Sequence, residues 1–170
     1  MDVLPPMRLR SPQGEEIALI ATPPVPRLLI FYRCDCETCM ELLPALERLS
    51  RAFHGKGLLT LGVSQDDQEE TEDVMAEHGL CFPQVLDDGL ALSRAAGVQV
   101  VPTLLVVDEA GRIVERSEAL SSDGVRRVVK SAGALCDASP GDLERALDRL
   151  ALPDHLPGSP SRTVDANESA

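Results

Sequence analysis

A short apolar run, followed at once by closely spaced cysteines and then by a helical pattern, constrains the fold of this chain most. Residues 28–32 are continuously apolar and end at a polar residue, which predicts a buried strand. Leucines recur along one side of residues 40–53, which predicts an amphipathic helix. Cys36 and Cys39, spaced Cys-x-x-Cys, therefore fall where a strand turns into the first turn of a helix.

That position matters for the chemistry of the two thiols. The unpaired N–H groups and the dipole of a helix N-terminus favour the thiolate, which is the reactive form of cysteine. We therefore expect Cys36 to be the outer, attacking sulfur. Cys39, one helical turn further on, is expected to be the sheltered partner that resolves a mixed disulfide.

Composition and charge exclude several classes of protein. The chain has 170 residues of which 44% are hydrophobic, which suits one globular domain with a sizeable core. Its net charge of −12 argues against nucleic acid and anionic membrane surfaces as partners. No apolar stretch approaches the length of a membrane span.

The N-terminal residues and the cysteine usage bear on the compartment. The chain starts without a basic segment followed by an apolar one, so we expect no signal peptide and a cytoplasmic location as sequenced. A truncated start would instead favour an extracytoplasmic location. Five cysteines, three of them within residues 34–39, do not resemble an evenly paired secreted scaffold and indicate redox or metal chemistry.

The remaining pattern predicts an α/β fold with a mixed central sheet flanked by helices. We expect a coil over residues 1–6, one domain over residues 7–152 and a disordered tail over residues 153–170. The expected strands form an N-terminal β-hairpin over 7–20, a single strand over 58–63, and a strand over 98–108 that forms a hairpin with 112–116. Two further helices are expected. One is capped by Ser64 and closed by Gly79, and the last covers 141–151 and is capped by Ser139.

Two stretches of the chain resemble a known family. Phe31-Tyr32, Cys36, Cys39 and Pro44 resemble the active-site stretch of thioredoxin-fold proteins, and residues 97–114 resemble the second signature of the TlpA/ResA-like, or redoxin, thiol–disulfide oxidoreductases. The resemblance covers roughly residues 7–130. It implies a thioredoxin-like fold, no cofactor, and a Cys36/Cys39 pair that cycles between dithiol and disulfide.

The resemblance also implies where a substrate binds. Pro102 should be cis and lie beside the two sulfurs, and Val101, Pro102 and Thr103 should contact the substrate. Because proline carries no N–H, the backbone of Val101 would be free to pair with an extended substrate segment. The implied partners are a protein disulfide and a dithiol that donates or accepts electrons, and we expect the protein to act as a monomer.

The chain departs from the family pattern near the cysteines. Ile30 and Leu42 stand where relatives carry an acid that shuttles the proton of the buried thiol, and Glu41 should face solvent. Asp35 and Glu37 flank Cys36 and oppose its ionisation, so we expect a pair that works as a reductant. A peroxidase is not expected, because the Pro-x-x-x-Thr-x-x-Cys pattern of peroxiredoxins is missing before Cys36.

Cys34 leaves alternatives open. It is a third redox thiol, a ligand in a Cu(I) or Zn(II) site with Cys36 and Cys39, or an incidental semi-buried thiol. The residues do not decide between these, and we commit to no metal. A second alternative to the enzyme is a thioredoxin-fold interaction module with vestigial cysteines, and we expect Cys81 to be a buried structural thiol.

Overall fold

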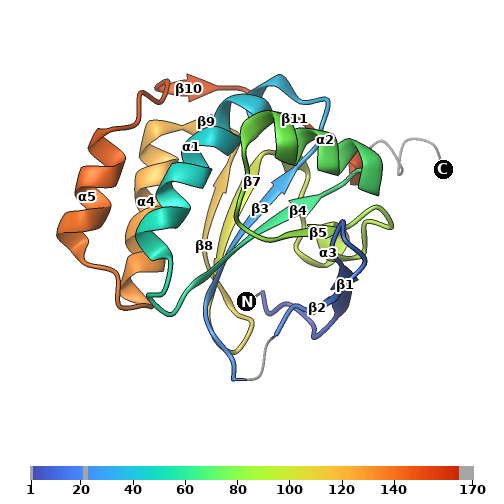
Figure 1. Cartoon of the computed structure of the whole chain (residues 1–170), viewed down its shortest axis with the longest axis horizontal. Helices are drawn as coiled ribbons and strands as arrows, with labels where there is room; N and C mark the ends of the chain where they lie inside the picture. Colours follow the sequence, from blue (N-terminus) through green and yellow to red (C-terminus); the bar gives the residue numbers. More distant parts are fainter. Residues whose placement is uncertain (1, 21–22, 165–170) are drawn as a thin grey trace.

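Strands and helices alternate along most of the chain in the computed structural model, which describes residues 2–20 and 23–164 (Figure 1). The principal strands are β1 (Arg8–Arg10), β2 (Glu16–Ala18), β3 (Arg27–Tyr32), β4 (Leu59–Ser64), β5 (Gln84–Leu86), β7 (Thr103–Val107) and β8 (Ile113–Glu118). They form one sheet in the order β2-β1-β5-β4-β3-β7-β8. β3 runs parallel to β4 and antiparallel to β7, so the sheet is mixed, as the sequence predicts.

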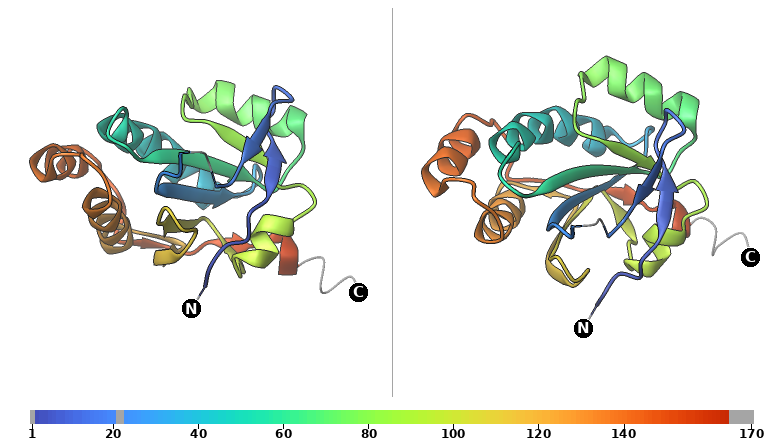
Figure 2. Two further views of the ribbon diagram at one scale, coloured as in Figure 1. Left: turned by 90° about the horizontal axis from the view of Figure 1, so that it is seen from below. Right: turned by 60° about the horizontal axis from the view of Figure 1, so that its bottom comes forward.

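Helices cover both faces of this sheet. They are α1 (Glu37–Phe53), α2 (Gln68–His78), α3 (Ala91–Ala95), α4 (Ser122–Ala134) and α5 (Pro140–Asp148). α1 and α2 lie over one face and α3 and α4 over the other, and both views in Figure 2 show these layers. α5 packs against α1 and α4 at the edge of the sandwich.

The core lies on both faces of the sheet, under α1 on one side and under α4 on the other. All of β3 is buried, as expected for a central strand flanked by parallel and antiparallel neighbours. The leucines of α1 pack against this sheet, and Leu42, Leu43 and Leu46 are almost completely buried. The strand and the helix on either side of the cysteines are therefore held by the core, and the turn between them has little freedom to move.

Several predicted elements are confirmed and others differ. The β1–β2 hairpin, the termination of α2 at Gly79 and the Ser139 cap of α5 are all present. Ser64, however, still pairs within β4, so the N-cap of α2 is Asp67, whose carboxylate accepts the N–H of Glu70 at 2.9 Å. The strand expected over residues 98–108 is interrupted at the proline and becomes β6 (Val100–Val101) and β7.

The prediction of a disordered tail from residue 153 is wrong for residues 153–164. This segment forms β10 (His155–Leu156), which pairs with β9 (Leu120–Ser121), and β11 (Ser159–Pro160), which pairs with β6. Ser161 is fully buried, and its hydroxyl accepts a hydrogen bond from the Gln65 amide at 2.8 Å. Composition alone suggested disorder, but these pairings are long-range and leave no local signal. Residues 165–170 lie outside the described residues.

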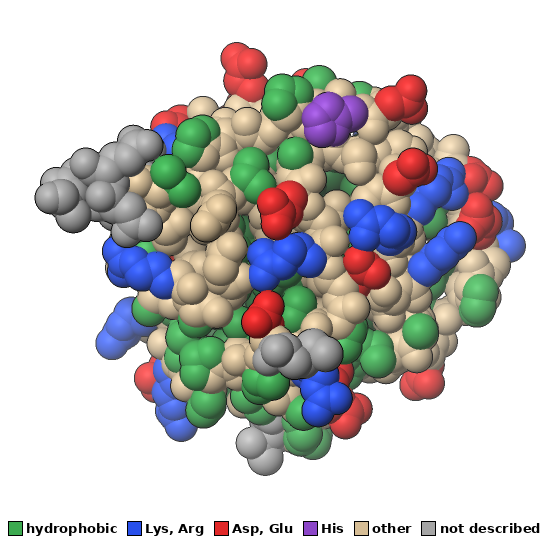
Figure 3. Space-filling view, turned by 180° about the vertical axis from the view of Figure 1, so that it is seen from behind, with side chains coloured by type: hydrophobic (Ala, Val, Ile, Leu, Met, Phe, Trp, Pro, Cys, Tyr) green, Lys and Arg blue, Asp and Glu red, His purple; other side chains and the backbone are tan. Residues whose placement is uncertain are grey.

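The surface is mixed in charge on the face turned away in Figure 1, where acidic and basic side chains are interspersed (Figure 3). Among the described residues, no helix combines the length and the apolar character needed to cross a membrane.

A buried carboxylate joins α1 to the loop before β5. Glu47 is 4% exposed and accepts the backbone N–H of Cys81 at 2.6 Å and that of Phe82 at 3.2 Å. Arg51, one turn along the helix, lies 3.5 Å from the second carboxylate oxygen. The two N–H groups have this side chain as their acceptor, so the loop depends on it.

We expect Glu47→Ala to lower the free energy of unfolding by about 2 kcal/mol, because it leaves two backbone donors without an acceptor. The measurement is urea denaturation followed by circular dichroism. Glu41→Ala, an exposed glutamate on the same helix, is the control and should change stability by no more than about 0.5 kcal/mol. Equal losses in the two variants would contradict the assigned role of Glu47.

Candidate active site

The sulfur of Cys36 caps the first helix. Cys36 is the N-cap residue of α1 with extended backbone angles (φ −100°, ψ 114°), and its Sγ accepts the N–H of Cys39 at 3.2 Å. β3 delivers the chain to this point, and the helix starts with the next residue, Glu37. The geometry expected from the Cys-x-x-Cys spacing is therefore present, with the sulfur serving as the capping acceptor.

The environment separates the two thiols chemically. Hydrogen bonds from Cys39 and from Ser159 lower the pKa of Cys36 to about 6, outweighing the opposing effect of burial. Burial raises the pKa of Cys39 far above its ordinary value, and the neighbouring Cys36 raises it further. At neutral pH Cys36 is therefore the thiolate and Cys39 the thiol, which is the division of roles expected for an attacking and a resolving cysteine.

Asp35 opposes the Cys36 thiolate less than its position in the sequence suggests. Its carboxylate accepts two hydrogen bonds from Arg33, each 3.0 Å long, and lies 3.4 Å from Arg162. The hydrogen bond to Arg33 is the main reason that the pKa of Asp35 is lowered. The two guanidinium groups offset the negative charge beside Cys36.

The structure differs from the expectation that Cys36 is the outer sulfur. Cys36 is 1% exposed and Cys39 is 0% exposed. Ser159 pairs with Val101, whose carbonyl oxygen lies 3.7 Å from the Cys36 sulfur, and hydrogen bonding by Ser159 contributes to the lowered pKa of Cys36. An open groove of about 710 Å³ runs beside the pair, with Leu156 and Pro157 in its wall. Cys36 is thus sheltered by the C-terminal segment of the same chain.

The loop before β7 stands next to the cysteines, as the resemblance implies. The Val101–Pro102 peptide bond is cis, and the carbonyl oxygen of Val101 lies 3.7 Å from Cys36 Sγ, where it accepts a hydrogen bond only when that thiol is protonated. Val101 and Thr103 are fully buried, and the Thr103 hydroxyl donates to the carbonyl of Val100 at 2.6 Å. The residues expected to contact a substrate therefore lie at the site, but the backbone of Val101 is already paired with Ser159.

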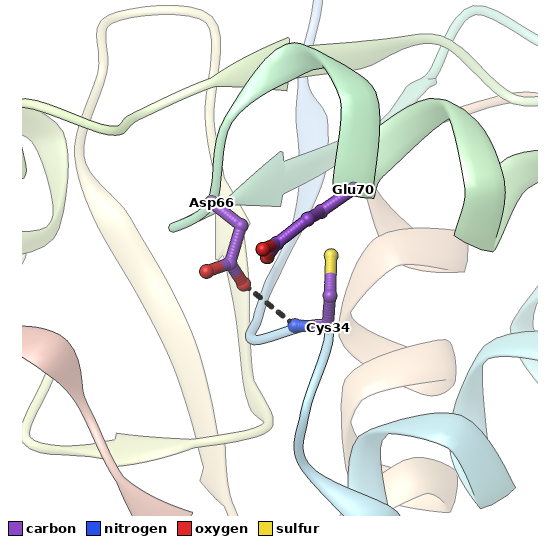
Figure 4. Close-up of side chains that lie close together, drawn as sticks. All are labelled: Cys34, Asp66 and Glu70. Atoms are coloured by element: carbon purple, nitrogen blue, oxygen red, sulfur yellow. Dashed lines mark hydrogen bonds between the residues drawn. The ribbon is translucent and has the colours of Figure 1, made fainter.

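Cys34 contacts residues at the end of β4 and in the loop that follows it. Its backbone N–H donates to Asp66 at 2.7 Å, and its sulfur lies 4.0 Å from the Ser64 hydroxyl (Figure 4). Burial, followed by the negative charge of Asp66, raises the pKa of Cys34 to about 12, so this thiol stays protonated at neutral pH. This environment fits a semi-buried structural thiol better than a redox partner of Cys36.

The three cysteine sulfurs do not gather into a metal site in the part of the chain that the structure describes. The ligand atoms that do come close are those of Cys34, Asp66 and Glu70, all within 4.8 Å of one another (Figure 4). Arg162 already neutralises Asp66, with its Nε 2.9 Å from the carboxylate, and a protonated thiol is a poor ligand. This group therefore resembles a hydrogen-bonded cluster more than a cation site.

The positions that hold a proton-shuttling acid in relatives are apolar here. Ile30 and Leu42 are fully buried, and Glu41 is exposed, as the helical pattern predicts. All five cysteines are free thiols in the structure. The prediction that Cys81 is buried is wrong, because its backbone is held by Glu47 while its side chain faces solvent.

Sequence reasoning missed the contribution of residues 155–163 to the site. The Thr38 hydroxyl donates to the carbonyl of Pro157 at 2.6 Å, and Arg33 donates to the carbonyl of Pro160 at 2.7 Å. Both acceptors are backbone carbonyls, which any sequence supplies.

A family model for the AhpC/TSA family matches residues 2–116. The match covers most of the chain and includes both cysteines and Pro102. The chain belongs to the AhpC/TSA family.

Curated relatives agree with this assignment. The chain is 30% identical over 108 residues to the thiol–disulfide oxidoreductase ResA of Halalkalibacterium halodurans, which covers 63% of this chain and 61% of that protein. It is also 30% identical over 115 residues to the Mercury resistance operon ORF3 protein of Streptomyces lividans, covering 64% of this chain and 61% of that one. The chain thus spans about three fifths of the length of these relatives.

Solved structures show the thioredoxin-like fold. The thioredoxin domain of a thiol–disulfide oxidoreductase from Bacteroides vulgatus matches with a TM-score of 0.67 and 26% identity, over 77% of this chain and 96% of that one. StoA from Bacillus subtilis matches with a TM-score of 0.61 and 22% identity, over 69% of this chain and 90% of that one, and supports the fold alone. The resemblance inferred from the sequence is confirmed in both family and fold.

The ionisation of Cys36 can be measured without any partner. Since its pKa is lowered to about 6, the ultraviolet thiolate absorbance of the reduced protein should increase through a transition near pH 6 as the pH is raised. Cys36→Ser should remove that transition. Cys34→Ser should leave it in place, because the pKa of Cys34 is raised to about 12. A transition that disappears in Cys34→Ser would mean that the wrong thiol has been assigned.

Proposed function

We propose that this protein is a thiol–disulfide oxidoreductase in which Cys36 and Cys39 exchange electrons with the disulfides of partner proteins. The observation that carries the proposal is the Cys36 sulfur at the N-cap of α1, with a pKa lowered to about 6 beside a Cys39 whose pKa is raised. This difference supports Cys36 as the nucleophile and Cys39 as the resolving thiol at neutral pH. Family membership and the named activity of the relatives support the same chemistry.

The reaction follows from this geometry. The Cys36 thiolate attacks one sulfur of a partner disulfide, forming a mixed disulfide and releasing the other sulfur as a thiolate. Cys39 then loses its proton and attacks Cys36, which releases the second partner thiol and leaves the Cys36–Cys39 disulfide. The partner is reduced by two electrons and the pair is oxidised by two. A second dithiol then restores the pair, and no cofactor takes part.

Formation of the mixed disulfide makes the following attack by Cys39 easier. Two of the effects that raise the pKa of Cys39 come from Cys36, through a hydrogen bond and through its charge. When Cys36 enters the mixed disulfide it becomes a neutral sulfur, so both effects disappear. Ionisation of Cys39 therefore becomes easier once a substrate is attached. This offers a way to activate the buried thiol in a site where Ile30 and Leu42 replace the usual acids.

We further propose that the pair acts as a reductant. The attacking cysteine of a strongly oxidising protein has a pKa of about 3.5, whereas the attacking cysteine of thioredoxin, which is a reductant, has a pKa of about 7. The value of about 6 for Cys36 is closer to the second group. A less stabilised thiolate makes the dithiol a better electron donor. Separately, we expect the loop from Val101 to Thr103 to bind the substrate backbone.

The nucleophile and the resolving thiol can be told apart by substitution. Cys36→Ser should reduce the catalysed reduction of insulin by dithiothreitol to the uncatalysed rate, because no attacking thiolate remains. Cys39→Ser should accumulate a covalent complex with the substrate, seen by non-reducing electrophoresis and mass spectrometry. Cys81→Ser, which changes an exposed thiol, is the control and should keep the activity. Full activity in Cys36→Ser would contradict the assignment.

The redox couple itself is tested by titration in dithiothreitol buffers, with alkylation and peptide mapping. We expect one two-electron transition that joins Cys36 to Cys39, with a midpoint nearer about −270 mV than about −120 mV. A disulfide that involves Cys34 would favour the three-thiol site. Failure of the pair to oxidise at all would favour an interaction module.

A further inference from the structure

The C-terminal segment occupies the place where the proposed function requires a substrate. Ser159 pairs with Val101 and Pro160 with Val100 in an antiparallel register, and the N–H of Ser161 donates to the carbonyl of Gln99 at 3.0 Å. This is the strand addition by which an extended polypeptide joins an open edge. Figure 1 shows the segment passing from β10 to β11 across the N-terminal end of α1.

The position of Ser159 within this pairing is chemically specific. It lies opposite Val101, whose carbonyl oxygen is 3.7 Å from the sulfur of Cys36, and hydrogen bonding by Ser159 is one cause of the lowered pKa of Cys36. Serine differs from cysteine by one atom, oxygen in place of sulfur. A cysteine at this point of an extended segment would therefore present its sulfur to the attacking thiolate. The segment is therefore bound as a substrate would be. At the position where a substrate would carry its cysteine, it carries Ser159, which cannot take part in disulfide exchange.

The ends of the segment are anchored by contacts on both sides of Cys36. On one side, Thr38 holds the carbonyl of Pro157 at 2.6 Å. On the other, Arg33 holds the carbonyl of Pro160 at 2.7 Å, and Arg162 lies 2.5 Å from the buried Asp66. The hydrogen bonds to Pro157 and Pro160 are single contacts that can open locally. Ser161, bound by Gln65 at 2.8 Å, and Thr163, bound to the Val98 carbonyl at 2.8 Å, are buried and keep the far end of the segment attached.

The segment lies unusually close to the loop beneath it at one residue. A Cβ atom on Gly158 would lie 2.3 Å from the carbonyl oxygen of Val101 and 2.6 Å from Val100 Cγ2. The first of these atoms is backbone and cannot move aside. Any side chain at position 158 would therefore push the segment away from β6. Replacing Gly158 by alanine, which adds one methyl group, is thus expected to open the site.

We propose that residues 155–163 are a built-in substrate mimic that closes Cys36 to partners, and that the substrates are extended polypeptide segments carrying a cysteine in the register of Ser159. Binding of a partner displaces the mimic and takes over its pairing with Val101. The proposal rests on the thiol–disulfide exchange proposed above for Cys36. It accounts for an attacking cysteine that is ionised yet 1% exposed.

The test compares Gly158→Ala with Gly89→Ala, a glycine with open space around its Cβ position. Alkylation of Cys36 by iodoacetamide is followed by peptide mass mapping at a pH well above its pKa, so that the rate reports access and not ionisation. We expect Gly158→Ala to react about tenfold faster than the wild type or more, because it shifts the population toward the open form. Gly89→Ala should react like the wild type.

Insulin reduction by the same three proteins separates this proposal from the proposed function. Faster insulin reduction by Gly158→Ala, but not by Gly89→Ala, supports both the substrate mimic and the proposed function. Equal insulin reduction and equal alkylation in all three proteins would overturn the mimic and leave the oxidoreductase intact. Faster alkylation in Gly158→Ala without insulin reduction by any of them would support the mimic as a cover of Cys36 and overturn the oxidoreductase.

A second variant tests the register without opening the site. In Ser159→Cys combined with Cys39→Ser, oxidised glutathione is the oxidant: Cys36 attacks it and releases one glutathione, and the introduced thiol then displaces the second. The product is a disulfide between positions 36 and 159, with two electrons transferred to glutathione. We expect this cross-link in intact-protein mass spectra and peptide maps. A stable glutathione adduct on Cys36 without the cross-link would overturn the assigned register.

Discussion

The hydrogen bond from the Cys39 N–H to the Cys36 sulfur is the contact on which the active site depends. It starts α1, since the sulfur takes the place of the oxygen that usually caps a helix, and it stabilises the anionic form of that sulfur. The same contact therefore has a structural and a chemical role. It is held in place by the burial of β3 on one side and of Leu42, Leu43 and Leu46 on the other.

This arrangement produces the chemical difference between two identical side chains. Cys36 sits outside the first turn and receives N–H donors, whereas Cys39 lies within the turn, against the core, and receives the charge of its neighbour. Neither Ile30 nor Leu42 offers a carboxylate to take the proton of Cys39. The state of Cys36 itself thus becomes the main means of adjusting the reactivity of Cys39.

The C-terminal segment gives the site a closed form. β6 is a two-residue strand that, without β11, would present open backbone groups next to the reactive sulfur. The pairing with β11 satisfies that edge and also adds donors to the Cys36 thiolate. One covering segment therefore contributes to stability, to thiolate formation and to the exclusion of solvent, and its contacts on either side of Cys36 are of a kind that can exchange with those of a partner.

The sequence by itself determined the strand–cysteine–helix unit, the family and most of the sheet, because those features follow from local periodicity and from motif spacing. β3, α1 and the N-terminal hairpin follow from such local signals, and the place of Pro102 follows from the resemblance to the family. What only the tertiary structure decided is what surrounds Cys36. The neutralisation of Asp35 by Arg162 joins residues that are 127 positions apart. The pairing of β11 with β6 places Ser159 opposite Val101, 58 positions away. Contacts of that range depend on how the elements pack, so no local pattern at residues 155–163 could have predicted them.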